Sequence, residues 1–353
     1  MSDVRPAQSD TAVVPYQQII DALAPCKRVL VTTHVRPDGD ALGSSVGLIL
    51  GLRARGIEAE FLTLSRLPRK YAFVVADNGV THHDADAGWP AALTDLSRFD
   101  ALVVCDTGTW NQLPGLKERL ADFAKPKLVI DHHLTQEDWA SAKLVVTAAA
   151  AAGEVVAELL ERWGVPLTPA IASALFLAIT SDTGWFQYAN TRPQTHRLAA
   201  RLIEAGVDTD RIYQLLYQNE RAERVALQAR GQQSLELHAG GRLAVMRVGR
   251  ADFAETRADV PDTESLINVP LQIRTVQASI LMTEPPEGGP IRVSLRSKGQ
   301  VDVARFAERF GGGGHARAAG LKLAGTLDAV HDAVVTALVD ALGPDVGADP
   351  APA

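Results

Sequence analysis

The chain has 353 residues, about twice the length of a common domain, so two domains are expected. Hydrophobic residues make up 46% of it and charged residues 22%, which excludes disordered, collagen-like and disulfide-stapled proteins. The formal net charge of -7 argues against a protein that coats long nucleic acids, but it leaves room for an enzyme that acts on short nucleotides.

The N-terminal residues 1–14 include charged side chains and no long apolar run. We expect a tail that is neither a signal peptide nor a membrane anchor, and hence a cytoplasmic protein. The two cysteines, Cys26 and Cys105, stand in apolar surroundings and are too few for a zinc ribbon or a disulfide framework, so we expect both to be buried.

Short apolar segments alternate with helical patterns in the first half of the chain. Strands are predicted at 28–33, 57–64, 101–105 and 127–130, and helices at 16–23, 42–55, 153–163 and 169–180. Short runs rich in Val and Ile between helices are typical of a parallel sheet buried on both faces. The first domain, 15–205, is therefore predicted to be α/β, with a mainly parallel sheet flanked by helices.

The last third of the chain differs in pattern. A polar helical linker is expected at 206–234, then a hairpin at 235–248, paired strands at 273–281 and 291–295, and a short helix at 303–310. This order predicts a second, smaller α/β domain with a mixed sheet at 235–343. Residues 344–353 have the composition of a frayed tail.

The densest group of polar residues follows the first predicted strand. His34 ends this strand, and Asp38 and Asp40 flank a glycine just after it. Two carboxylates in one tight turn raise each other's pKa unless a cation lies between them, so this segment is a candidate metal site. The alternative is a solvated turn in which Asp38 and Asp40 cap the next helix.

Three further segments place carboxylates or imidazoles at the ends of predicted elements. Asp106 ends one strand, Asp131-His132-His133 ends another, and Asp182 ends a helix, where the helix dipole disfavours a carboxylate without a cation. The carboxyl ends of parallel strands meet at one edge of a sheet, so these residues should converge on the first group. The expected ligands are His34, Asp38, Asp40, Asp106, His132 and Asp182.

These ligands are oxygen and imidazole donors without a thiolate, a set that suits Mn²⁺ or Mg²⁺ better than a structural zinc ion. Their number fits two metal ions that share one carboxylate. Two ions about 3.5–4 Å apart are a standard arrangement for phosphoester hydrolysis.

A second dense group lies near the C-terminal end of the chain. The run Gly311–Gly314 precedes His315, and upstream Arg292, Ser294 and Arg296 share one strand face by period-two spacing. The two segments favour a cradle for a phosphate or a nucleotide. The alternative is a flexible glycine loop beside a solvated basic strand.

Other polar and aromatic residues are weaker candidates. We expect His82-His83-Asp84 to lie in a surface loop, and His196 to be structural or exposed. Trp185 and Phe186 are interpreted as part of a wall or core rather than a stacking platform.

Taken in chain order, the four segments with the expected metal ligands resemble the DHH phosphoesterase family. The segments Arg292–Ser297 and Gly311–His315 resemble its DHHA1 domain. The resemblance covers about residues 16–342. It implies one metal ion held by His34, Asp38 and Asp106, and a second held by Asp40, Asp106, His132 and Asp182. It further implies that His133 contacts the scissile phosphate, that Asp131 orients the neighbouring histidine, and that substrate is bound by Arg292, Ser294, Arg296, Ser297, Gly312, Gly313, Gly314 and His315.

The segments at 182–186 and 189–191 resemble the nanoRNase and pAp-phosphatase group of this family. This resemblance implies a Mn²⁺-dependent enzyme for short RNA oligonucleotides, dinucleotides such as pApA, or 3′-phosphoadenosine 5′-phosphate (pAp), with no membrane or long duplex as partner. A homodimer is compatible with the sequence. Alternatives are a cyclic-di-AMP phosphodiesterase, a RecJ-type single-strand exonuclease, an inorganic pyrophosphatase and a nucleotide-sensing binding protein without activity.

Overall fold

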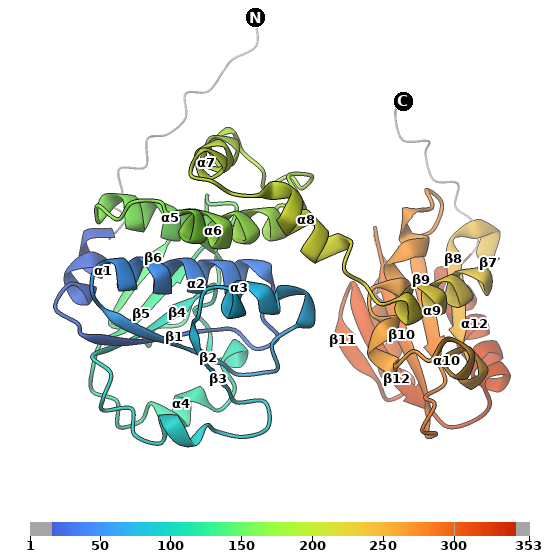
Figure 1. Cartoon of the computed structure of the whole chain (residues 1–353). Helices are drawn as coiled ribbons and strands as arrows, with labels where there is room; N and C mark the ends of the chain where they lie inside the picture. The colour runs from blue at the N-terminus through green and yellow to red at the C-terminus, as the bar shows by residue number, and fades with distance from the viewer. Residues whose placement is uncertain (1–15, 300, 344–353) are drawn as a thin grey trace, which may run out of the picture. The chain divides into compact units, whose positions relative to one another are not determined.

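The computed structural model describes residues 16–299 and 301–343; the expected tails, 1–14 and 344–353, lie outside them. The chain divides into two units, one up to Asn219 and one from Glu220 onwards (Figure 1). The expected linker, 206–234, supplies one helix to each of these units.

The first unit is built on a parallel six-stranded sheet with the order β3-β2-β1-β4-β5-β6. Its strands are β1 (Arg28–Thr33), β2 (Glu58–Thr63), β3 (Thr81–Asp84), β4 (Ala101–Cys105), β5 (Lys127–Asp131) and β6 (Ala142–Val145). After β1 the chain adds β2 and β3 on one side of it, and then adds β4 on the other side. The carboxyl ends of β1 and β4 therefore flank a switch point, where ligands bind in open α/β sheets.

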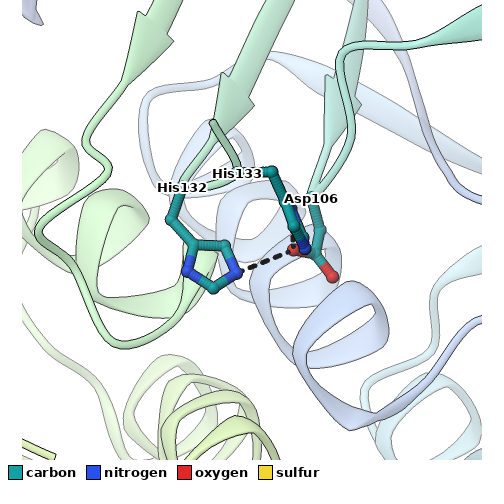
Figure 2. Close-up of side chains that lie close together, drawn as sticks. All are labelled: Asp106, His132 and His133. Atoms are coloured by element: carbon teal, nitrogen blue, oxygen red, sulfur yellow. Dashed lines mark ion pairs between the residues drawn. The ribbon is translucent and has the colours of Figure 1, made fainter. Parts of the chain in front are cut away.

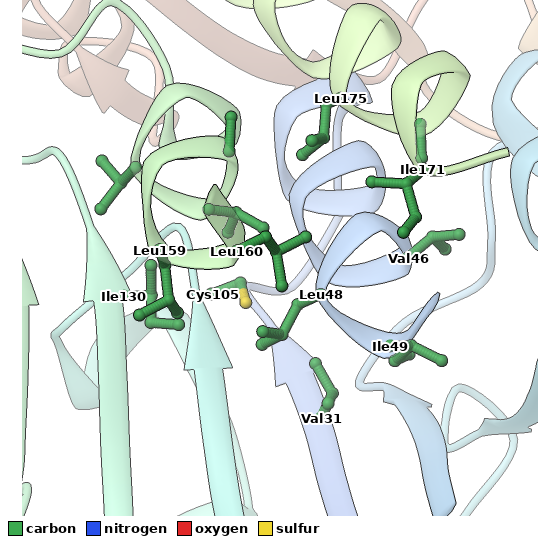
Figure 3. Packing of buried hydrophobic residues seen from close by; sticks show 14 of the residues in the cluster. Val31, Val46, Leu48, Ile49, Cys105, Ile130, Leu159, Leu160, Ile171 and Leu175 are labelled. Atoms are coloured by element: carbon green, nitrogen blue, oxygen red, sulfur yellow. The ribbon is translucent and has the colours of Figure 1, made fainter. Parts of the chain in front are cut away.

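Helices and turns cover both faces of this sheet. The helices are α1 (Tyr16–Leu23), α2 (Gly39–Ala54), α3 (Ala72–Ala76), α4 (Leu116–Arg119), α5 (Ala152–Arg162), α6 (Pro169–Asp182), α7 (Pro193–Glu204) and α8 (Thr209–Tyr217). On one face, Val31 and Ile130 pack with Leu48 and Leu160 of α2 and α5 (Figure 3). Because side chains alternate along a strand, Leu30 and its neighbours pack on the other face with α4, which explains the unbroken apolar runs.

Helix α2 is buried along most of its length and carries glycines at four-residue intervals. A Cβ atom at Gly43 would lie 2.4 Å from the carbonyl oxygen of Ala174 in α6, and one at Gly47 would lie 2.7 Å from Leu175. The glycines therefore let α2 and α6 approach more closely than larger side chains would permit. This contact brings the first turn of α2, with Asp40, near the last residue of α6, Asp182.

The second unit is built on a mixed six-stranded sheet with the order β11-β12-β10-β9-β8-β7, in which β8 and β9 are parallel and the other neighbours antiparallel. Its strands are β7 (Glu236–His238), β8 (Leu243–Val248), β9 (Ala278–Thr283), β10 (Ile291–Ser297), β11 (Gly313–His315) and β12 (Ala318–Leu323). Its helices are α9 (Ala222–Gln233), α10 (Arg250–Thr256), α11 (Val303–Glu308) and α12 (Leu327–Leu342).

The two faces of this sheet are covered differently. Val293 and Leu295 of β10 pack beneath α11 and α12. On the opposite face, Leu281 of β9 packs with Leu227 of α9, whereas β10, β12 and β11 present exposed residues on that face. The second unit thus has a half-open sheet face.

The α/β architecture with a parallel and a mixed sheet is confirmed. One strand prediction was wrong at its start: the strand expected from Ile273 begins at Ala278. The chain turns before it, where Lys298 donates hydrogen bonds to the carbonyls of Leu271 and Ile273. Among the described residues, no helix is both long and apolar enough to span a membrane.

Candidate active site

The six expected metal ligands converge at the carboxyl edge of the first sheet. His34 follows β1, Asp106 follows β4 and His132 follows β5. Asp38 and Asp40 belong to the start of α2, where Asp38 is the N-cap, and Asp182 ends α6. Oδ1 of Asp38 accepts hydrogen bonds from the amides of Asp40 and Ala41, as the capping alternative expected. This cap is compatible with the prediction that Asp38 is a metal ligand.

Asp106 lies at the centre of this group and faces a different histidine with each oxygen. Its Oδ2 is 3.4 Å from Nε2 of His34. Its Oδ1 is 3.5 Å from Nε2 of His132, a contact that Figure 2 shows. Oδ1 is also 3.6 Å from Nδ1 of His133. The carboxylate is therefore placed to bridge two neighbouring sites.

The expected ligands form two neighbouring sets of three, and Asp106 belongs to the first of them. Within each set the ligand atoms all lie within 4.8 Å of one another: His34, Asp38 and Asp106 form one set, and Asp40, His132 and Asp182 form the other. Nε2 of His132 is 3.7 Å from Oδ2 of Asp40 and 3.5 Å from Oδ2 of Asp182. Each set could hold one metal ion.

Both imidazoles in these sets point their Nε2 atom at the centre. Nδ1 of His34 lies 2.9 Å from the carbonyl of Val35, and Nδ1 of His132 lies 3.2 Å from that of Ala149. A carbonyl accepts only from a protonated nitrogen, so these contacts fix the proton on Nδ1 in the neutral ring. The lone pair of Nε2 is then available to a cation.

The Asp40 carboxylate is held by the start of α5. Its Oδ2 accepts a 2.6 Å hydrogen bond from the amide of Ala152, and its Oδ1 accepts a 2.9 Å bond from that of Gly153. Burial nevertheless raises the pKa of Asp40 well above its usual range, and the carboxylates of Asp106 and Asp182 add to this effect. The site therefore has unrelieved negative charge that a cation would offset.

The other groups of the site titrate abnormally as well. Burial by itself would lower the pKa of His34 and of His132. Attraction to the neighbouring Asp106 carboxylate more than offsets this effect and raises each pKa to about 9. Burial raises the pKa of Asp182 to about 6. Burial also favours the neutral form of Asp106, but the two imidazoles prevail and lower its pKa.

Two buried atoms test whether these residues fit a metal ion. Within the described part of the chain, Oδ1 of Asp106 and Nε2 of His132 have no hydrogen-bond partner. Buried polar atoms rarely lack a partner, because the loss of hydration is costly. Their orientation toward each other and toward other ligands fits a divalent cation as the missing partner.

Asp131 and His133 form a pair beside the metal ligands. Oδ1 of Asp131, which is fully buried, lies 2.8 Å from Nδ1 of His133 and accepts hydrogen bonds from the amides of His132 and His133. Gln136, which the sequence reasoning missed, donates a 2.5 Å hydrogen bond to Oδ2 of Asp131. The His133 side chain is 56% exposed, so its Nε2 is accessible to a substrate.

The backbone near the ligands adopts uncommon conformations. Asp106 has a φ of 64°, and Trp185 and Phe186, soon after Asp182, have φ values of 60° and 67°. Aspartate tolerates this left-handed region better than most residues, but for the bulky Trp185 and Phe186 it is strained, and such strain concentrates at functional sites. Trp185 and Phe186 pack against the core, which agrees with their interpretation as a wall.

In the second unit, the expected substrate residues lie mostly on the half-open sheet face. Pairing places Arg296 opposite Ala318, and Ala318 opposite His315; Ser294 lies opposite Gly320, and Gly320 opposite Gly313. Residues directly opposite in antiparallel strands share a face. On this face Ser294 therefore lies beside Gly320 and Gly313, which form a bare row without side chains. The next row carries the side chains of Arg296 and His315.

Other expected substrate residues differ in position. Arg292 lies on this face and pairs with the exposed Lys322, which the sequence reasoning missed because it belongs to a different strand. Ser297 is buried on the opposite face and donates hydrogen bonds to the carbonyls of Val301 and Ala316, so its hydroxyl is engaged within the fold. Gly312 and Gly314 pack so closely on β12 that a Cβ atom would clash.

The loop predicted for His82-His83-Asp84 was wrong. These residues form the edge strand β3, which pairs in parallel with β2. Nε2 of His82 lies 2.9 Å from Oγ1 of Thr63, and Nε2 of His83 lies 2.7 Å from Oε2 of Glu60. Partners on β2 hold both rings, which explains why so polar a segment forms a strand. His196 is exposed and stacks on Phe186, with ring centroids 5.1 Å apart.

Comparison with known proteins identifies related families and folds. Residues 28–179 match the DHH family, N-terminal domain, and residues 240–342 match the DHHA1 domain. The bifunctional oligoribonuclease and PAP phosphatase NrnA of Thermus thermophilus is 30% identical over 319 residues, 89% of this chain and 90% of that protein. The protein of the same name from Bacillus subtilis is 25% identical over 313 residues, 87% and 92% of the two chains.

A solved structure has the same fold over nearly the whole chain. The exopolyphosphatase-related protein of Bacteroides fragilis superposes with a TM-score of 0.80 at 23% identity and covers 93% of this chain and 96% of its own. The order of the two units is therefore shared with a protein of clearly different sequence.

Proposed function

Because this chain belongs to the DHH phosphoesterase family, we propose that it hydrolyses short RNA oligonucleotides, dinucleotides such as pApA, and pAp, with two Mn²⁺ ions in its first unit. The relatives from Thermus thermophilus and Bacillus subtilis, named for oligoribonuclease and PAP phosphatase activity, support this choice of substrates. The domain limits expected from the sequence, 15–205 and 235–343 with a linker at 206–234, and a cytoplasmic location belong to the same proposal.

The single observation that carries the proposal is the position of Asp106. One carboxylate faces His34 with Oδ2 and His132 with Oδ1, and each histidine belongs to a separate three-ligand set. A carboxylate that faces both of two neighbouring sites suits the spacing of about 3.5–4 Å between the ions of two-metal hydrolases. When bound, the ions would supply a nucleophilic hydroxide near neutral pH and polarise the phosphoryl oxygens.

The protein's own residues would divide the remaining work. Asp131 holds His133 by Nδ1, so Nε2 of this ring is directed to solvent, where it is available to donate a hydrogen bond to a phosphate oxygen. The Asp131 hydrogen bond raises the pKa of His133, which favours the protonated, phosphate-binding ring. Asp40 is fixed by two backbone amides, so a ligand oxygen is already oriented before metal binds.

The half-open face of the second unit suits the anchored part of the substrate. Arg292, Arg296 and His315 supply positive charge or hydrogen-bond donors along it, and the row of Gly313 and Gly320 lets a ligand approach the backbone. An anionic nucleotide end would bind there.

The test is a comparison of turnover on four substrates: pAp, pApA, a five-nucleotide RNA and cyclic di-AMP, each with Mn²⁺, Mg²⁺ or chelator. We expect mononucleotide or phosphate release from the first three with Mn²⁺ and none with chelator. The His132→Ala variant should fold and lose this activity, because one metal set loses its imidazole. Full Mn²⁺-dependent turnover by His132→Ala would refute the ligand assignment, and substrate binding without any turnover would favour a nucleotide sensor.

A further inference from the structure

Three metal-ligating side chains meet in the second unit, although they are far apart in the sequence. Glu236 and His238 belong to the edge strand β7, and His331 lies in the second turn of α12. Residues two apart on a strand share a face. The partners of Glu236 and His238 on β8 are Val245 and Leu243, which belong to the core beneath α12, so both side chains are on the face where His331 lies.

The two distances from the Glu236 oxygen to the imidazoles are close to those around a small divalent cation. Oε2 of Glu236 is 3.3 Å from Nε2 of His238 and 3.1 Å from Nε2 of His331, and the ligand atoms all lie within 4.8 Å of one another. Ligands bound at about 2.0–2.1 Å to a tetrahedral zinc ion lie about 3.3–3.4 Å apart. The ligands therefore need little movement to bind an ion.

Neighbouring residues orient two of the three ligands. Nδ1 of His331 lies 3.0 Å from Oδ1 of Asp332, so a carboxylate behind the ring can hold the proton on Nδ1 when a cation replaces the proton between Nε2 and Glu236. Arg247 holds the other carboxylate oxygen, Oε1 of Glu236, at 2.5 Å and also contacts Asp328 at 3.1 Å. A carboxylate behind the histidine is the usual support of a metal-bound imidazole.

Charge and exposure also favour a cation. Glu236, Asp328 and Asp332 supply three negative charges against the single positive charge of Arg247 when the imidazoles are neutral. The side chains of Glu236, His238 and His331 are 34%, 29% and 12% exposed, so the ion has a path from solvent and water can complete its coordination.

We propose that Glu236, His238 and His331 form a metal site of the second unit that takes Zn²⁺. Two imidazoles and one carboxylate suit zinc better than Mg²⁺ or Ca²⁺, which prefer oxygen ligands. The ion would link the edge strand β7 to α12 and stabilise their packing. It shares no residue with the ligands around Asp106, and the proposal holds whatever the substrate of the first unit is.

The experiment measures zinc per chain in the full-length protein after equilibrium dialysis against ZnCl₂ near pH 7.5. The variants His331→Gln and His238→Gln should each bind one zinc ion fewer than the wild type and keep Mn²⁺-dependent turnover. His196→Gln is the matched control, an exposed histidine that belongs to no such cluster among the described residues, and should bind as much zinc as the wild type. Co²⁺ in place of zinc gives a second readout, since its visible absorption reports four-coordinate binding.

The same zinc content in both cluster variants and in the wild type would overturn the proposal, and would leave the three residues as an ion-pair network between β7 and α12. If His331→Gln fails to fold, His238→Gln decides, because His238 is the more exposed ring and lies on an edge strand. Zinc should also raise the thermal unfolding temperature of the wild type more than that of His238→Gln.

Discussion

Oδ1 of Asp131 lies 2.8 Å from Nδ1 of His133, a contact between a buried carboxylate and an exposed ring. The pair separates two functions that adjacent residues of one motif perform. His132 points its Nε2 at the metal ligands, whereas His133 presents its Nε2 to solvent. In the proposed mechanism Asp131 is a positioning residue, because it contacts the ring of His133 and not the substrate.

Asp131→Asn should therefore lower kcat/KM by about 10–100-fold and leave metal affinity nearly unchanged. The asparagine keeps an acceptor for the amides of His132 and His133, but it does not stabilise the charged imidazole. Steady-state kinetics on pApA over a range of pH checks this, and the pH at which His133 titrates should fall. Wild-type kcat/KM together with an unchanged pH profile would show that Asp131 has only a structural role.

Metal binding should release protons. In the metal-free protein His34 and His132 titrate at about 9, so both rings are charged at pH 7 and each must lose a proton to bind a cation. Mn²⁺ affinity should rise with pH up to about 9. Isothermal titration calorimetry in buffers of different ionisation enthalpy counts the protons. No proton release at pH 7 would contradict the titration of these rings.

The same shift predicts how the stability of the metal-free protein varies with pH. The folded-state pKa of about 9 is above the usual value of 6.5, so the ion pairs with Asp106 stabilise the fold fully below pH 6.5 and lose this effect as the pH rises through 9. The unfolding temperature of the metal-free protein should fall over this range. The Mn²⁺-loaded protein is the control and should change less.

Gly43→Val should destabilise the first unit by about 1–3 kcal/mol and weaken metal binding. Its Cβ atom would overlap the backbone of α6 at Ala174, so α2 and α6 must move apart, and with them Asp40 and Asp182. Ala54→Val, at an exposed position of the same helix, is the control and should change the free energy of unfolding by less than about 0.5 kcal/mol. Chemical denaturation and Mn²⁺ titration of both variants check this; equal stability would mean that the helices tolerate the added side chain.

Gly313→Val separates the packing and binding functions of the glycine run. A Cβ atom at Gly313 meets no atom within 4 Å, so the fold should tolerate valine, but the side chain would occupy the bare row beside Ser294. We expect KM for pApA to rise at least about tenfold, which corresponds to about 1.4 kcal/mol of binding free energy, with a small change in kcat. Gly314→Val should instead impair folding. An unchanged KM for Gly313→Val would place the nucleotide elsewhere.

Arg296→Ala should likewise raise KM more than it lowers kcat, because Arg296 lies on the proposed binding face of the second unit and belongs to neither set of metal ligands. Ser294→Ala and Ser297→Ala form a matched pair. The first should raise KM, whereas the second should lower stability, since the hydroxyl of Ser297 is bonded to two backbone carbonyls. Kinetics and thermal unfolding distinguish these effects, and the reverse pattern would exclude the assigned face.

Local patterns made much of the fold and the site predictable. A strand buried on both faces of a parallel sheet is mainly apolar, so the first charged residue after it, such as Asp106, marks the sheet edge. His82 and His83 broke this rule, because on the edge strand β3 polar rings are paired by Thr63 and Glu60 of the next strand. Contacts of that kind depend on register, which polar composition does not reveal.

Long-range pairing accounts for the other residues that the sequence reasoning missed. Lys322 joins Arg292 only through the register of β12 on β10, and Glu236 meets His331 only through the packing of α12. Ser297 was expected to bind substrate, but its side chain lies within the fold. It follows a row of substrate candidates in the sequence, but period two places it on the buried face.

The backbone of Asp106 imposes a second requirement on the residue at this position. Its φ of 64° is tolerated by glycine, asparagine and aspartate with little strain, while a bridging site requires a carboxylate. Glycine would satisfy the conformation without a ligand, asparagine would satisfy it without the charge, and glutamate would restore the charge on a strained and longer arm. Of the twenty amino acids, aspartate alone combines a tolerated left-handed conformation with a short carboxylate, so the turn after β4 restricts the choice of residue here independently of any metal ion.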